Sequence, residues 1–150
     1  MLLDLLYMRL TNFTFDTSVE LGVAARHRYL DLHNCFDWQS ITYLSEERRI
    51  TMSWIRSTGD WVRPDLPPAL ALEFRGVSRF TACPRDTDLS YNEDSCLASV
   101  TFSPPDFATN FVGVFEGYRG DSEHITFLFQ SGFGMKIWAE EVELIYDRST

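Results

Sequence analysis

The sequence lacks the motifs by which most catalytic sites are recognised. It contains no G-x-S-x-G elbow, no Walker glycine loop, no H-E-x-x-H pair and no C-x-x-C pair. Only three histidines are present, and the sole candidate for a nucleophile beside a base is Cys35 with His33. Side chains two residues apart on one strand diverge too far for a good hydrogen bond between them. We therefore expect a protein that is not an enzyme and that needs no cofactor.

Cysteine is also scarce, and the chain has no long hydrophobic run. Cys35, Cys83 and Cys96 are an odd number of thiols, which argues against a framework of disulfides. The apolar start, MLLDLLYMRL, is interrupted by Asp4 and Arg9 and has neither a basic leader region nor a small-residue cleavage site. These features predict reduced thiols, no membrane span and a cytoplasmic protein.

Basic residues are also few relative to acidic ones. Lysine and arginine together number 13 against 22 acidic residues, which gives a net charge of -9. After residue 75 the chain holds five basic and twelve acidic residues. Such a field repels nucleic acid phosphate and anionic lipid, so neither is an expected partner, whereas it attracts a cationic protein surface. Solubility alone is the alternative explanation for the acidity.

The strongest positive signal is an alternation of apolar and polar residues. Apolar side chains occupy every second position on both sides of Ser131-Gly132, namely Ile125, Phe127, Phe129, then Phe133, Met135, Ile137 and Ala139. A period of two is typical of a strand with one apolar face, and a connection that contains glycine lets the chain reverse. The runs 124–130 and 133–140 therefore predict a β-hairpin that turns one face to the core and a polar face to water.

Similar short runs extend over most of the chain. Strands are expected at 10–15, 29–38, 41–43, 50–54, 70–74, 77–83, 96–102, 110–116 and 142–146, with a polar turn at 45–48, a loop at 59–68 and a bend at Gly76. The T-x-x-E sequence at Thr17 has the form of a helix-capping box, so one short helix could follow it. The pattern predicts a single all-β domain, 1–150, folded as an antiparallel β-sandwich or partly closed barrel with at most one short helix.

Three segments together resemble a known group of proteins. They are Leu32-His33-Asn34-Cys35, the pair Ile41-Thr42-Tyr43 and Arg49-Ile50-Thr51-Met52, and the run Leu70 to Val77 with Phe80. This pattern, over about a third of the chain, resembles small uncharacterised bacterial β-rich proteins, some of them associated with toxin immunity. The resemblance implies an immunity or binding role and no catalytic residue. The chain departs from it at Asn34, where an acid is expected.

One candidate for metal binding lies in the expected strand 29–38. Asp31, His33, Cys35 and Asp37 alternate there, so all four would project from the same face. Imidazole, thiolate and carboxylate are ordinary zinc ligands, although neighbours two apart on a strand are about 6.5 to 7 Å apart, so only two adjacent members could reach one ion. A half-solvated sheet face is the alternative, and we expect no metal site.

The second candidate is an acidic stretch. Oxygen ligands at alternating spacing suit calcium, and the stretch offers Asp86, Asp88, Asn92, Glu93 and Asp94. The central glycine of an EF-hand is missing and Leu89 to Tyr91 interrupts the ligand series, so calcium is not expected. A surface loop that contacts arginine or lysine of a partner fits better, with Tyr91 as an aromatic anchor.

Taken together, the residues favour a non-enzymatic binding protein that recognises a cationic protein through its acidic surface, and the resemblance implies a protein of the immunity type. The alternative is a small-molecule or metal-binding β-barrel, in which Phe127, Phe129, Phe133 and Trp54 would line a pocket instead of filling a core.

Overall fold

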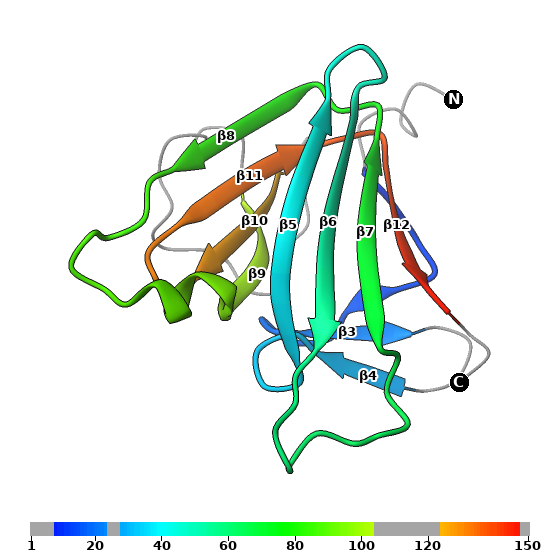
Figure 1. Cartoon of the computed structure of the whole chain (residues 1–150). Helices are drawn as coiled ribbons and strands as arrows, with labels where there is room; N and C mark the ends of the chain where they lie inside the picture. Colours follow the sequence, from blue (N-terminus) through cyan, green and yellow to red (C-terminus); the bar gives the residue numbers. More distant parts are fainter. Residues whose placement is uncertain (1–7, 24–27, 104–123, 148–150) are drawn as a thin grey trace.

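A computed structural model describes residues 8–23, 28–103 and 124–147. Within these ranges the regular secondary structure is almost entirely β-strand (Figure 1). The strands are β1 (Arg9–Thr11), β2 (Thr14–Phe15), β3 (Glu20–Val23), β4 (Arg28–Asp31), β5 (Phe36–Leu44), β6 (Arg49–Arg56), β7 (Ala69–Arg75), β8 (Arg79–Cys83), β9 (Leu97–Ser103), β10 (His124–Phe129), β11 (Gly134–Trp138) and β12 (Glu141–Tyr146). A short 3-10 helix, η2 (Tyr91–Ser95), precedes β9.

The strands form three sheets. A five-stranded sheet has the order β1-β12-β7-β6-β5, a four-stranded sheet the order β8-β11-β10-β9, and a three-stranded sheet the order β2-β3-β4. Neighbouring strands are antiparallel except for β1, which runs parallel to β12. The all-β, sandwich-like prediction is therefore confirmed, and the sheets that the described residues form do not close into a barrel.

Alternation explains why the five-stranded sheet buries one face. Ile50, Met52 and Trp54 of β6 are buried, and residues of the same parity in β7 lie opposite them, with Ile50 beside Phe74 and Met52 beside Leu72. The intervening positions carry polar or small side chains. One face of this sheet therefore contributes to the core and the other meets solvent.

Aromatic rings join the five-stranded sheet to the four-stranded one. The ring of Phe127 lies 6.3 Å from that of Trp54 and 6.1 Å from that of Phe74, and the ring of Trp38 lies 4.7 Å from that of Phe129. Phe133 stacks on Trp38 at 5.9 Å. These side chains pack on one another between the two sheets, and Phe127, Phe129 and Trp54 are buried in the core.

The predicted hairpin is present as β10 and β11. Ile125 lies opposite Ile137, Phe127 lies opposite Met135, and Gly132 has a φ of +81° in the connection. The prediction of a second, water-facing side was wrong, because Thr126 and Lys136 are also buried. Burial lowers the pKa of Lys136.

Two predictions near the N-terminus were wrong. The hydroxyl oxygen of Thr17 does accept the backbone N–H groups of Val19 and Glu20, as a cap would, but the following residues form β3 and pair with β2 and β4. The expected strand 10–15 is broken into β1 and β2 at Asn12, whose φ is +72°. Pairing with strands distant in sequence decided both outcomes, which local capping chemistry does not predict.

The predicted strand 29–38 was also wrong, because a turn at 32–35 separates β4 from β5. Most of the other predicted elements agree with the structure. The turn at 45–48, the loop at 59–68 and the bend at Gly76, whose φ is +68°, are all present. The predicted strand 110–116 lies outside the described residues. Across the three described ranges, no helix is long and apolar enough to span a bilayer.

Candidate functional site

The four metal-ligand candidates lie on two strands and the turn between them, not on one strand. The chain leaves β4 at Asp31, turns through 32–35 and enters β5 at Phe36. The Asp31 carboxylate holds this turn, since Oδ1 accepts the backbone N–H groups of His33 and Asn34 at 3.0 Å and Oδ2 accepts Nδ2 of Asn34 at 2.9 Å. Local capture of backbone N–H groups by an aspartate is typical of turns. The prediction that Asp31, His33, Cys35 and Asp37 share one strand face was therefore wrong.

His33 contacts a different cysteine from the one that the sequence placed beside it. Its Nδ1 lies 2.7 Å from the Leu97 carbonyl oxygen and 3.4 Å from Sγ of Cys96. A carbonyl can only accept, so Nδ1 carries the proton and cannot take one from the thiol. Burial, together with the negative charges of Glu93, Asp37 and Asp31, raises the pKa of Cys96. This pair therefore lacks the features of an activated nucleophile.

Within the described ranges, the remaining candidate ligands do not complete a metal site. Burial and the nearby charge of Asp31 raise the pKa of Cys35, so its thiol keeps its proton. No group of three or more histidine, cysteine, aspartate or glutamate side chains in the described ranges is arranged to hold a metal ion. All three cysteines are free of disulfides.

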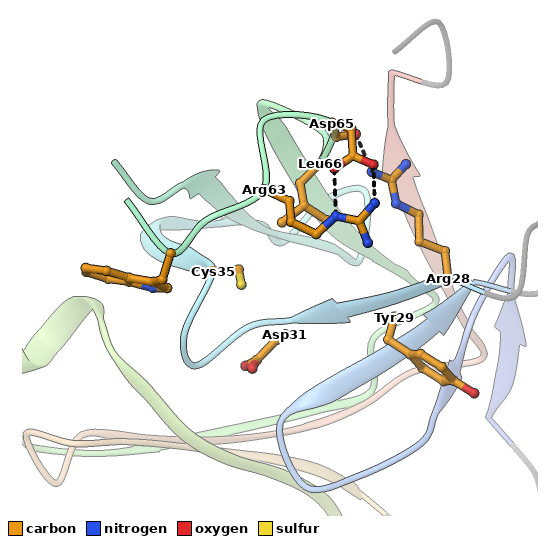
Figure 2. A pocket seen from close by; sticks show the side chains of 8 residues that line it. Arg28, Tyr29, Asp31, Cys35, Arg63, Asp65 and Leu66 are labelled. Atoms are coloured by element: carbon orange, nitrogen blue, oxygen red, sulfur yellow. Dashed lines mark hydrogen bonds and ion pairs between the residues drawn. The ribbon is translucent and has the colours of Figure 1, made fainter. Parts of the chain in front are cut away.

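An open pocket of about 560 Å³ lies beside this turn (Figure 2). Its walls come from β4, the turn and the β6–β7 loop, and are formed by Arg28, Tyr29, Asp31, Cys35, Trp61, Arg63, Asp65 and Leu66. The Arg63 guanidinium donates two hydrogen bonds to the Asp65 carboxylate, from Nε to Oδ1 at 3.0 Å and from Nη2 to Oδ2 at 2.6 Å. Arg28 donates to the Asp65 carbonyl oxygen. The Arg63 guanidinium lowers the pKa of Asp65, so the pocket rim is charged but internally paired.

Trp61 is the more exposed of the two aromatic residues that line this pocket. Its side chain is held by a 2.9 Å hydrogen bond from Nε1 to the Asn34 carbonyl oxygen, although 71% of the residue is exposed. Gly59 leaves room for the Trp61 ring, because a Cβ atom at position 59 would lie only 2.2 Å from a ring carbon and would clash with it. The indole is therefore fixed in one orientation while remaining accessible. The sequence prediction did not include Trp61. The signal available in the sequence was a tryptophan within the proline-rich loop 59–68.

The acidic stretch 84–96 is organised by a single arginine. Arg85 donates from Nε to Oδ1 of Asp94 at 2.9 Å and from Nη2 to the carbonyl oxygens of Leu89 and Ser90. Its guanidinium lies 4.6 Å from the ring centroid of Tyr91. Hydrogen bonds from Arg85 and Ser131 lower the pKa of Asp94. The sequence prediction did not include Arg85, a basic residue within an acidic run.

The five predicted partner-binding residues therefore have different environments. Asp86, Asp88 and Tyr91 are exposed, and Glu93 is half-exposed. The Asp86 carboxylate accepts the backbone N–H of Asp88 at 2.9 Å. Asp94 is half-buried and paired with Arg85, so it contributes less charge to the surface than its neighbours.

Three segments meet at one end of the molecule, which we call the loop end. It consists of 28–37, the β6–β7 loop with its flanks (56–68) and the β8–β9 connection (84–96). The Trp61–Asn34 bond joins the first two, and the contacts of His33 with Cys96 and Leu97 join the first to the third. In Figure 1 the β4–β5 turn, the β6–β7 loop and η2 all lie toward the lower side of the view.

The loop end carries eight acidic residues and four arginines. Each arginine is already bonded to the chain, Arg28 and Arg63 to Asp65, Arg85 to Asp94, and Arg56 to the carbonyl oxygens of Pro64 and Leu66. Within the described ranges, no cation forms an ion pair with the carboxylates of Asp31, Asp37, Asp60, Asp86, Asp88 and Glu93. The loop end therefore presents a net negative surface to solvent.

Comparisons with known proteins found no matching family model, no matching curated protein and no matching solved structure.

Proposed function

We propose that this chain is a non-enzymatic binding protein of the immunity type, which recognises a cationic protein through its loop end. The observation that carries the proposal is the imbalance of charge there. The arginines are used within the fold, whereas exposed carboxylates such as those of Asp86 and Asp88 have no cation among the described residues. A basic partner surface supplies the missing counter-charge.

Exposed aromatic side chains on the same end support a protein as the partner. Tyr29, Trp61 and Tyr91 are 58%, 71% and 81% exposed. Tyrosine and tryptophan are enriched among the residues that contribute most to protein–protein binding, because they bury a large area at little cost in side-chain entropy. Arg85 and Asn34 hold two of these rings in place before a partner arrives, which reduces the entropy lost on binding.

The same charge argues against nucleic acid as the partner, since a net charge of -9 repels phosphate. We also infer that the protein acts in the bacterial cytoplasm, where its three unpaired cysteines stay reduced.

The proposal is tested with the protein encoded by the gene immediately upstream, which is the expected toxin. The acidic variant carries Asp86→Asn, Asp88→Asn and Glu93→Gln, and the matched control carries Glu46→Gln, Glu47→Gln and Glu140→Gln at the opposite ends of β5 and β11. Association rates are measured by surface plasmon resonance at low and physiological salt. We expect the acidic variant to associate with the partner at least about tenfold more slowly than the wild-type protein at low salt. The control should differ little from the wild-type protein, because electrostatic attraction during encounter depends mainly on charges near the binding surface.

Two results would contradict the proposal. An equal loss in both triple variants would show that only the total charge matters. Binding by the wild-type protein that is indifferent to salt and to the acidic variant would place the contact elsewhere on the surface.

A further inference from the structure

The five-stranded sheet ends in a strand that differs from the other sheet edges in the described ranges. β1 and β2 have three and two residues, β4 has four with Arg28 and Asp31 at its ends, and β8 has five and begins with Arg79. The edge of β9 is covered, because Val100 donates to the Ser18 carbonyl oxygen and the Leu97 carbonyl oxygen contacts His33. Short length, charge and covering are the usual means by which proteins protect sheet edges.

β5 has none of these protections along most of its length. It is nine residues long, and the segment 38–44 contains no charged residue and no proline. A bulge between Trp38 and Ser40 interrupts its pairing with β6, but the register is regular from Ser40 to Leu44. Within the described ranges, the backbone of 37–44 pairs only with β6. An edge of this kind presents unpaired N–H and C=O groups to another strand.

We propose that the outer edge of β5 accepts an extended segment of the cationic partner, which adds to the sheet as a further strand. This inference rests on the proposed function and specifies how the partner is held. Strand addition satisfies the free backbone groups of β5, and alternate side chains of the incoming segment supply specificity. The rings of Tyr43 and Phe80, 5.9 Å apart and 48% and 37% exposed, provide apolar contact beside the edge.

Charge selects a basic segment over a second copy of this chain. β5 begins beside the loop end, where η2 packs against it, so the incoming strand meets Asp37 and Glu93 at that end. The acid Asp37 has no ion-pair partner in the described ranges, and its charge contributes to raising the pKa of Cys96 nearby. A second copy carries the same -9 charge and the same acids, which disfavours its approach.

The probe is the peptide Lys-Lys-Thr-Val-Thr-Val-Thr-Lys-Lys, whose lysines at both ends make the test independent of strand direction. One control has glutamates in place of all lysines, and a second has every central peptide nitrogen methylated. The first control changes only the charge, and the second removes the backbone donors while keeping the side chains. Backbone amide exchange of the full chain is followed by NMR with and without each peptide.

We expect the lysine peptide to slow exchange of amides within 40–44 at least about tenfold at saturation. The methylated peptide should give no such protection, and the glutamate peptide should bind at least about tenfold more weakly. The double variant Asp37→Asn with Glu93→Gln should remove most of that difference, whereas Glu140→Gln, which follows β11 and lies away from β5, should keep it.

Three results of this experiment would overturn the inference. They are unchanged exchange within 40–44, equal binding of the methylated peptide, and β5 protection that arises from a dimer detected by sedimentation without peptide. A natural partner that depends on Asp86 and Asp88 but leaves 40–44 unprotected would overturn this inference and leave the proposed function standing. Binding of the lysine peptide to β5, with no natural partner sensitive to the loop-end acids, would support strand addition and contradict the proposed function.

Discussion

Replacement of Phe127 by alanine removes one of the side chains that join the two larger sheets. Phe127 is fully buried on β10, lies between Val100 and Met135 in the sheet register, and contacts the rings of Trp54 and Phe74 at 6.3 and 6.1 Å. A buried Phe→Ala change costs about 3–5 kcal/mol through lost burial and a residual cavity. Two ring contacts, each worth about 0.5–1.5 kcal/mol beyond burial, place this site near the upper value.

Urea unfolding followed by tryptophan fluorescence measures the loss. With a slope of about 2 kcal/mol per molar urea, a loss of about 5 kcal/mol lowers the midpoint by about 2.5 M while the slope stays constant. Phe80→Ala is the matched control, because Phe80 is 37% exposed on the edge strand β8 and should cost about 1 kcal/mol or less. Equal midpoint shifts in the two variants would refute the assignment of Phe127 to the inter-sheet core.

Three further predictions concern the turn, a buried histidine and metal. Asp31→Ala should destabilise the fold by about 1–3 kcal/mol in urea unfolding, because two backbone N–H groups lose their acceptor, whereas Asp31→Asn keeps an acceptor oxygen and should cost less. Burial, then the charges of Arg79 and Lys136, lower the pKa of His124 to about 4. Since the unfolded state then binds the proton more tightly, stability should fall as pH drops from about 6.5 to about 4, by up to about 3 kcal/mol, and this dependence should disappear in His124→Asn. Purified protein should contain no stoichiometric zinc and should keep its melting temperature on chelation; one zinc per chain, absent in Cys35→Ser, would contradict this.

The hairpin shows where a period of two is sufficient. Ile125, Phe127 and Ile137 were predicted to face the core, and all three are buried. The same period predicted that Thr126 and Lys136 face water, and both are buried as well. Alternation separates two faces of a strand, but whether the second face is covered depends on other parts of the chain.

The β4–β5 turn shows where local pattern misleads. Leu30, Leu32 and Phe36 have the alternating parity of a strand and are all buried, yet the chain turns between them. These residues belong to the same core, so the apolar spacing continues across the turn. The Asp31 and Asn34 spacing, which supports hydrogen bonds to turn N–H groups, was the signal available for the reversal.

The fold class, most strand positions and the excess of acidic charge could be predicted from the sequence, because they depend on short-range alternation, turn residues and composition. Which segments contact one another depends on how the sheets pack, and became known from the structure. In the structure His33 contacts Cys96 instead of Cys35, and Asp94 is paired with Arg85. Trp61 is hydrogen-bonded to Asn34 in the β4–β5 turn. β5 lies at the edge of its sheet. These contacts join residues far apart in the chain, and a single sequence contains no periodic signal for such distances.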